Sequence, residues 1–179
     1  MIIGALLLTL AGLAVGGCGG GGSDVNTITY EAYDLGAGFA PIRRENNLKP
    51  GPNGLDGSEP KPVIPDLPPP EFMIIKDLLD GIGTQADPGT KLTIQYVGYD
   101  YDTKKKFASS WDEGKPTTFT LGSGEMMEGI EKGLYLAEVS DQRELVIPPD
   151  MTKPGSKMKD VPQGKTLVYV IDLLDVEPS

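Results

Sequence analysis

A few groups of residues have a spacing that suggests chemistry, and the glycine-rich residues 81–86 form the first. They fit the alanine-ended dinucleotide-binding fingerprint, in which backbone N–H groups at the start of a helix hold a pyrophosphate. The next residues are Asp87, Pro88 and Gly89, which would break such a helix, and no strand–helix–strand unit follows. We therefore expect residues 81–86 to form a turn between strands.

Carboxylates form the second group. Asp100 and Asp102 lack the spacing and the glutamate of a calcium loop, so they are expected in a solvated hairpin. Glu125, Glu128 and Glu131 recur at helical spacing, but nothing places a second acid opposite them. A solvent-facing stripe is therefore expected rather than a catalytic pair, and no metal site is predicted.

The chain has 179 residues, with 26 acidic and 16 basic side chains and no histidine. Without histidine, neither a Ser-His-Asp or Cys-His nucleophile nor an imidazole metal ligand is possible. A net charge of −10 argues against nucleic acid as a partner, because binding a phosphate backbone depends on clustered lysine and arginine. The 24 glycines and 16 prolines exceed ordinary usage and indicate that part of the chain is not packed.

Cys18, the single cysteine, follows an almost wholly apolar run over residues 1–17. That run is shorter than the ~20 residues of a membrane-spanning helix, so it is interpreted as the core of a signal peptide. Residues 15–18 resemble a bacterial lipoprotein signal, which implies cleavage before Cys18 and a lipid on its sulfur and new amino terminus. The first basic residue is Arg43, so the usual positive start is missing; a retained anchor or a buried segment is the alternative.

Residues 18–70 contain runs of glycine and proline, which disfavour both helix and sheet. We interpret them as a flexible tether with a reach on the order of 40 Å. Residues 27–33 have weak strand character and could bind a partner, although a linker is the simpler interpretation.

Residues 71–179 have the pattern of one folded domain. Apolar and polar residues alternate over residues 92–96, 118–121, 144–147 and 167–174, which predicts strands. The last of these places Leu167, Tyr169, Ile171 and Leu173 on one face. One short helix is predicted over residues 125–132, with Gly133 as its C-cap. Many strands and one helix indicate an α+β fold in which an antiparallel sheet wraps around the helix.

The order of motifs in residues 72–177 also resembles the FK506-binding-protein (FKBP) family of peptidyl-prolyl isomerases. The segments that carry the resemblance are residues 89–98, 105–112, 115–116, 119, 121–122, 125–133, 147–150 and 166–169. They occur in the family's order and close to its spacing. The resemblance implies an FKBP-like fold, with a strongly curved antiparallel sheet around the short helix and a hydrophobic pocket between them.

Position by position, the resemblance implies that Tyr96, Phe107 and Tyr169 are catalytic side chains and that the backbone N–H of Met127 donates to the substrate carbonyl. The residues implied to contact substrate are Met126, Ile130, Phe119 and Trp111. Rotation about an X–Pro bond has a barrier of ~18–20 kcal/mol, and a dry aromatic pocket favours the twisted amide without proton transfer. No cofactor is implied.

Four positions depart from the family pattern. Ala108 stands where the family usually has aspartate and Glu113 where its partner arginine often lies. Lys153 replaces a tyrosine, and Ile130 replaces the usual tryptophan of the helix. Because the acid and its cation are both absent, neither is left as a buried unpaired charge. These changes support a second hypothesis, a binding module or chaperone of the cell envelope with weak or no isomerase activity.

The first hypothesis combines the two resemblances. It describes a monomeric prolyl isomerase in the cell envelope, held outside the cytoplasm by a lipid on Cys18. Its partners would be proline-containing polypeptides and the membrane. Because uncatalysed X–Pro isomerisation takes tens to hundreds of seconds, such an enzyme would speed a slow folding step of exported proteins.

Overall fold

The computed structural model describes residues 28–31, 42–46 and 55–178. Cys18 and the signal peptide predicted over residues 1–17 lie outside the described residues. Within the described ranges, no helix is long and apolar enough to cross a membrane.

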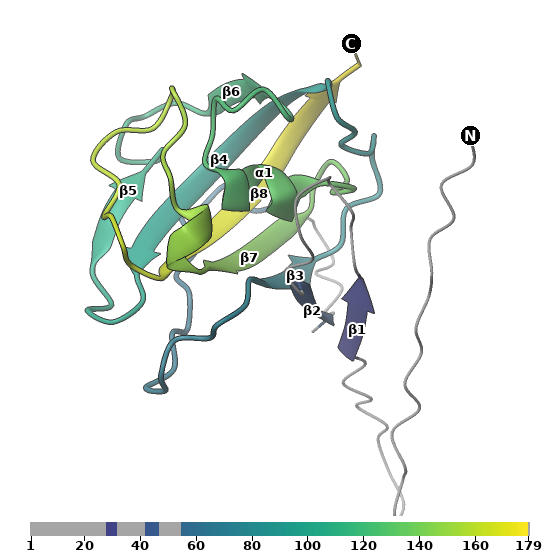
Figure 1. The fold of residues 1–179 in the computed structure, drawn as a ribbon. Coiled ribbons are helices and arrows are strands. Elements are labelled where there is room, and N and C mark those ends of the chain that lie inside the picture. The colour runs from purple at the N-terminus through teal and green to yellow at the C-terminus, as the bar shows by residue number, and fades with distance from the viewer. Residues whose placement is uncertain (1–27, 32–41, 47–54, 179) are drawn as a thin grey trace, which may run out of the picture.

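The described chain forms one sheet with one short α-helix on its concave face (Figure 1). In chain order, the elements are β1 (Ile28–Glu31), β2 (Ile42–Asn46), β3 (Ile74–Leu79), β4 (Lys91–Asp100), β5 (Lys106–Ser109), β6 (Thr117–Thr120), α1 (Glu128–Leu134), β7 (Gln142–Ile147), the 3₁₀ turn η1 (Pro149–Met151) and β8 (Leu167–Glu177). The strand order is β1-β2-β3-β7-β8-β4-β5, and β6 also pairs with β4. All of these pairs are antiparallel except β2 with β3. The α+β class predicted from the sequence, a sheet around one short helix, is confirmed.

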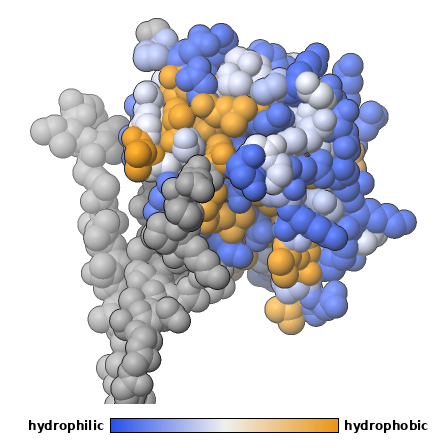
Figure 2. Space-filling model, turned by 180° about the vertical axis from the view of Figure 1, so that it is seen from behind, coloured by the Kyte–Doolittle hydropathy of each residue, from blue (hydrophilic) through white to orange (hydrophobic). Residues whose placement is uncertain are grey.

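The two faces of β8 explain why the sheet has a core on each side. Leu167, Tyr169, Ile171 and Leu173 are fully buried in the main core beneath α1, as the alternation predicts. Val168 points to the opposite side, where it joins Val146 and Tyr101 in a second, smaller apolar cluster. Figure 2 views that side of the molecule and shows hydrophobic residues gathered among hydrophilic ones.

The helix differs from its predicted bounds. It begins at Glu128 and ends at Leu134, so Gly133 is an internal residue and not the predicted C-cap. A Cβ on Gly133 would lie 2.5 Å from Leu145 Cδ1 of β7, which shows that glycine is needed there for close packing. Glu125 lies before the helix, where its carboxylate accepts the backbone N–H of Thr120 at 2.9 Å.

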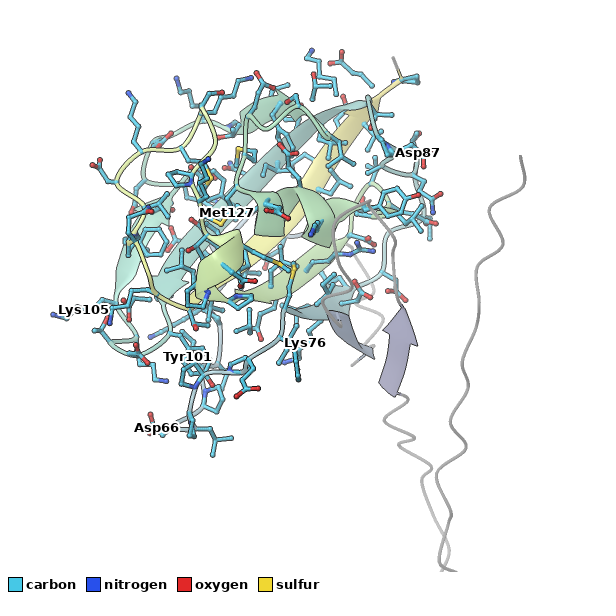
Figure 3. The ribbon with its side chains drawn as sticks, in the orientation of Figure 1. Asp66, Lys76, Asp87, Tyr101, Lys105 and Met127 are labelled. Carbon is cyan, nitrogen blue, oxygen red and sulfur yellow. The ribbon has the colours of Figure 1, made fainter. Side chains whose placement is uncertain are left out.

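Residues 55–70 contain no helix or strand, yet they contact the domain. The indole Nε1–H of Trp111 donates to the carbonyl of Gly57 at 3.0 Å, and Lys104 Nζ donates to the carbonyl of Pro65 at 2.7 Å. The carboxylate of Glu59 accepts the hydroxyl of Ser109 at 2.6 Å. Figure 3 shows Asp66 and Tyr101 at the same end of the molecule. Contacts to the domain thus begin upstream of residue 71, where the sequence places its start. The prediction of a tether without helix or sheet over residues 18–70 is also wrong at two places, because Ile28–Glu31 and Ile42–Asn46 are strands and β2 pairs with β3.

Residues 81–86 connect β3 to β4 without a helix. The backbone of Ala86 bonds to that of Ala137, and Gln85 forms an isolated bridge with Glu138. A Cβ on Gly81 would lie 2.2 Å from the carbonyl oxygen of Val139. The glycine therefore serves a close backbone approach rather than a phosphate loop.

Candidate functional site

The fold brings together six of the residues that the resemblance assigns to the pocket. They come from the concave face of the sheet and from the start of α1, and they share the main core: Tyr96, Phe119, Met126, Met127, Ile130 and Tyr169. Phe107 of β5 packs against this group and is half-buried. We call these seven residues the aromatic pocket. Met127, Ile130 and Tyr169 have no exposed surface.

The ring of Tyr169 is the centre of the aromatic contacts. Its centroid lies 5.7 Å from that of Phe107, with the rings at 88°, and 6.0 Å from that of Tyr96. An edge-to-face pair of this kind is favourable beyond its buried area. A Cβ on Gly98 would lie 2.9 Å from both Phe107 and Tyr169, so glycine at this position of β4 lets the two rings approach the strand.

The hydroxyl groups of the pocket are neutral. Burial raises the pKa of Tyr96, the charge of Glu113 raises it further, and a hydrogen bond with Thr117 opposes both. Burial also raises the pKa of Tyr169, whose hydroxyl has no hydrogen-bond partner within the described part of the chain. The aromatic pocket therefore consists of apolar side chains and uncharged hydroxyl groups, which suit binding of an amide better than acid–base chemistry.

The backbone N–H of Met127 points to another residue of the main core. Met127 is the N-cap residue of α1, so its N–H has no partner inside the helix. This N–H donates to Sδ of Met158 at 3.2 Å, and Met158 belongs to the buried core. Figure 3 shows Met127 at the start of α1, in front of the sheet. Sequence reasoning missed Met158, because neither periodicity nor the resemblance indicates a role for a methionine in the loop before β8.

The remaining positions singled out in the sequence lie around the pocket or away from it. Trp111 is not part of the core and instead contacts Gly57. Ala108 packs against the core and is partly buried, whereas Glu113 and Lys153 are exposed. No charged group therefore lies at position 108 to shape the pocket wall.

The carboxylates at the start of α1 have structural partners. Glu131 accepts the backbone N–H of Met126 at 3.2 Å, and Glu128 forms an ion pair with Lys132 at 2.7 Å. Glu125 pairs with Lys157 at 3.0 Å. The three glutamates therefore hold the helix and its preceding turn in place rather than forming a catalytic pair. Within the described residues, no cluster of His, Cys, Asp and Glu side chains could hold a metal ion.

An open groove of about 520 Å³ lies beside the aromatic pocket. It runs along α1 and is bordered by Leu121, Met126, Lys132, Tyr135, Lys153 and Pro154, among other residues. Of the predicted site residues, Met126 alone lines it; the other members of the aromatic pocket are buried, except Phe107, which is half-buried. The groove and the aromatic pocket are therefore two features that meet at Met126.

Known proteins are similar to this chain in both sequence and fold. The chain is 34% identical over 116 residues to a protein named "Probable FK506-binding protein" from Corynebacterium glutamicum, which covers 65% of the chain and 97% of that protein. It is 33% identical over 120 residues to an FK506-binding protein from Streptomyces anulatus, covering 66% and 97% of the two chains.

Among solved structures, AtFKBP13 superposes with a TM-score of 0.50 at 28% identity and covers 60% of this chain and 94% of its own. FkpA from Escherichia coli superposes with a TM-score of 0.53 at 27% identity, and the match spans 60% of this chain and about half, 49%, of FkpA. Residues 83–174, just over half of the chain, match the family described as FKBP-type peptidyl-prolyl cis-trans isomerase. The chain therefore belongs to the FKBP-type peptidyl-prolyl cis-trans isomerase family.

Proposed function

We propose that this protein catalyses cis–trans isomerisation of X–Pro bonds outside the cytoplasm, where it assists the folding of exported proteins. The observation that carries the catalytic part is the aromatic pocket, with the Met127 N–H beside it directed at Met158 of the same core. The apolar run and Cys18 support the location. A lipid on Cys18 would hold the chain at the membrane, and residues upstream of the domain would let it reach unfolded substrates.

Catalysis would rest on preferential binding of the twisted amide. In the planar state, resonance gives the X–Pro bond partial double-bond character and a large dipole, which water solvates well. A pocket lined by Phe107, Tyr96 and Tyr169 stabilises the less dipolar, twisted amide relative to the planar amide. The Met127 N–H would orient the peptide by donating to a substrate carbonyl. Because no proton moves, the absence of histidine is compatible with this reaction.

A second candidate function is a binding module with weak or no isomerase activity. It is favoured by Ala108, which leaves the pocket wall without the family's usual aspartate, and by the burial of the pocket. Such a module would hold proline-containing segments without accelerating their isomerisation.

A refolding or protease-coupled isomerase assay on the full chain tests the proposal. We expect turnover of an X–Pro peptide clearly above buffer, and a fall of about tenfold in kcat/KM for Phe107→Leu, since a half-buried ring can be replaced without opening the core. Turnover equal to buffer in a chain shown to be folded by circular dichroism would contradict catalysis. Large activation by combined Ala108→Asp and Glu113→Arg would then identify a degenerate isomerase acting as a binding module.

The membrane location is tested separately. We expect the full chain, expressed in a bacterium, to fractionate with membranes and to carry a lipid-modified Cys18 at its amino terminus by mass spectrometry. Cys18→Ser is expected to release the protein from the membrane fraction after processing, or to leave its leader uncleaved. A Cys18→Ser chain with the same mass pattern and fractionation as the wild type would contradict lipid anchoring.

A further inference from the structure

We propose that Met158 is an internal ligand of the aromatic pocket, and that an X–Pro substrate binds by displacing it. Met158 would therefore determine how tightly the pocket holds a substrate. This inference rests on the proposed isomerase function, and it concerns a residue outside the set that the sequence assigns to the pocket.

The first support is the contact itself. The Met127 N–H is the group expected to donate a hydrogen bond to a substrate carbonyl. Here it donates to Met158, with 3.2 Å between the backbone nitrogen and Sδ. Only 8% of Met158 is exposed, and it shares the core with Met126 and Tyr169. A thioether is a weak acceptor on a flexible, apolar side chain. A carbonyl oxygen is a stronger acceptor, so substrate can compete for the same N–H.

The second support is the way the loop before β8 is held. The backbone N–H of Lys157 donates to the carbonyl of Glu125 at 2.9 Å, and the two side chains form an ion pair at 3.0 Å. Gly155 packs closely against the same part of the chain. A Cβ at this position would lie 2.4 Å from the carbonyl oxygens of Glu125 and Met126. The residues just before Met158 are therefore anchored beside the pocket.

The residues after Met158 are held differently. Residues 159–165 make no backbone–backbone hydrogen bond to the rest of the described chain. Asp160 has φ 54° and Gly164 has φ 66°, so this stretch contains two left-handed positions. Side chains hold this stretch instead, because Val161 is buried in the main core and Lys165 pairs with Asp102 at 3.4 Å. The side chain of Met158 can leave the pocket without breaking a strand pairing.

Displacement has a measurable consequence for affinity. When a binding-competent form is only a fraction of the population, the apparent affinity falls by that fraction. Removing the Met158 side chain should remove this internal competitor. We expect Met158→Ala to lower KM for a tetrapeptide with a Leu-Pro bond by roughly threefold to tenfold, with a smaller effect on kcat. Met158→Leu should give an intermediate KM, because leucine fills volume but accepts no hydrogen bond.

The matched control is Met151→Ala. Met151 is buried to a similar degree in η1, and its sulfur accepts no hydrogen bond in the described part of the chain. We expect this variant to leave KM unchanged.

A second measurement does not depend on activity. In the full chain labelled for NMR, Met158→Ala should speed hydrogen exchange of the Met127 amide, and peptide titration into the wild type should shift the Met158 methyl signal.

Two results would overturn the inference: a KM or peptide affinity of Met158→Ala that is no tighter than the wild type, or a Met158 methyl signal that stays fixed at peptide saturation. Failure of the proposed function has a different signature. In that case, wild type and Met158→Ala would both lack turnover, while Met158→Ala still bound the peptide more tightly and lost protection of the Met127 amide.

Discussion

Tyr169 combines a ring that contacts Phe107 and Tyr96 with a hydroxyl that has no hydrogen-bond partner among the described residues. The side chain is fully buried, and its oxygen has no hydrogen-bond partner within the described residues. A buried unsatisfied hydroxyl is destabilising, so we expect Tyr169→Phe to raise the free energy of unfolding by about 1–2 kcal/mol. Urea unfolding monitored by circular dichroism measures the change. Tyr96→Phe is the control, because its hydroxyl bonds to Thr117 and its loss should lower stability by about 1 kcal/mol. Equal effects of both variants would contradict this account.

At the same scale, sequence reasoning predicted most of the residues that the fold gathers in this core, but not Met158. Tyr96 and Tyr169 alternate with polar or outward-facing residues on strands, so a period of two places them correctly. Met158 lies in a loop, where no period applies and the partner of a side chain is set by tertiary folding. Trp111 shows the opposite limit: the resemblance places it at the pocket, whereas its indole N–H donates to Gly57, which lies outside the residues 72–177 that carry the resemblance.

The packing of α1 on β7 depends on glycine. A Cβ on Gly133 would lie 2.5 and 2.7 Å from the two methyl carbons of Leu145, and one on Gly129 would lie 2.4 Å from Ile147. In an exposed helix, Gly→Ala stabilises by roughly 0.5–1 kcal/mol. Here we expect Gly133→Ala to destabilise by about 1–3 kcal/mol, because the helix must move away from the strand. Thermal or urea unfolding measures this.

Glu128→Ala on the exposed side of α1 is the matched control for Gly133→Ala. It removes an ion pair with Lys132 that contributes about 0.3–0.5 kcal/mol. Stabilisation by Gly133→Ala would show that the helix is not held as closely as described. The same close approach explains why the end of the helix was not predictable. In a sequence, a glycine such as Gly133 indicates a helix C-terminus, unless it is known that a neighbouring strand requires glycine for close packing.

The pairing of β7 with β8 contains a carboxyl group that should make stability depend on pH. Burial raises the pKa of Asp172 from 3.8 to about 6, and the hydrogen bond from Gln142 only partly offsets this. The folded state therefore binds this proton more tightly than the unfolded state, and stability falls as pH rises from about 4 to 6.5. We expect Asp172→Asn to flatten that fall and to gain about 1–3 kcal/mol at pH 7.5. Urea unfolding at pH 4.5 and 7.5 measures both effects, and Asp175→Asn on an exposed position of β8 is the control. A wild-type slope retained in Asp172→Asn would contradict the assignment.

At the scale of the whole molecule, composition predicted a tether without helix or sheet over residues 18–70. That prediction is wrong for Ile28–Glu31 and Ile42–Asn46, which are strands β1 and β2, and it could not show where residues 55–70 lie. Proline and glycine remove hydrogen-bond donors and restrict helix and sheet, and this part of the chain indeed has neither. Its contacts come instead from side chains of the domain, such as Trp111 and Lys104, which reach carbonyl groups of the segment. Interactions of that kind leave no periodic signal in either partner.

These contacts can be measured because Trp111 is the only tryptophan of the chain. Two truncated chains, one beginning at residue 55 and one at residue 71, differ only in the segment that contains Gly57, Glu59 and Pro65. Both lack β1 and β2, so the comparison isolates residues 55–70.

We expect the shorter chain to show red-shifted emission and stronger acrylamide quenching, because the indole loses the carbonyl of Gly57 and part of its cover. Its free energy of unfolding should be lower by about 1–2 kcal/mol, since the partners of Trp111 and Ser109 are lost. Identical emission, quenching and stability of the two chains would mean that the segment does not lie on the domain in solution, and that the fold is complete from residue 71.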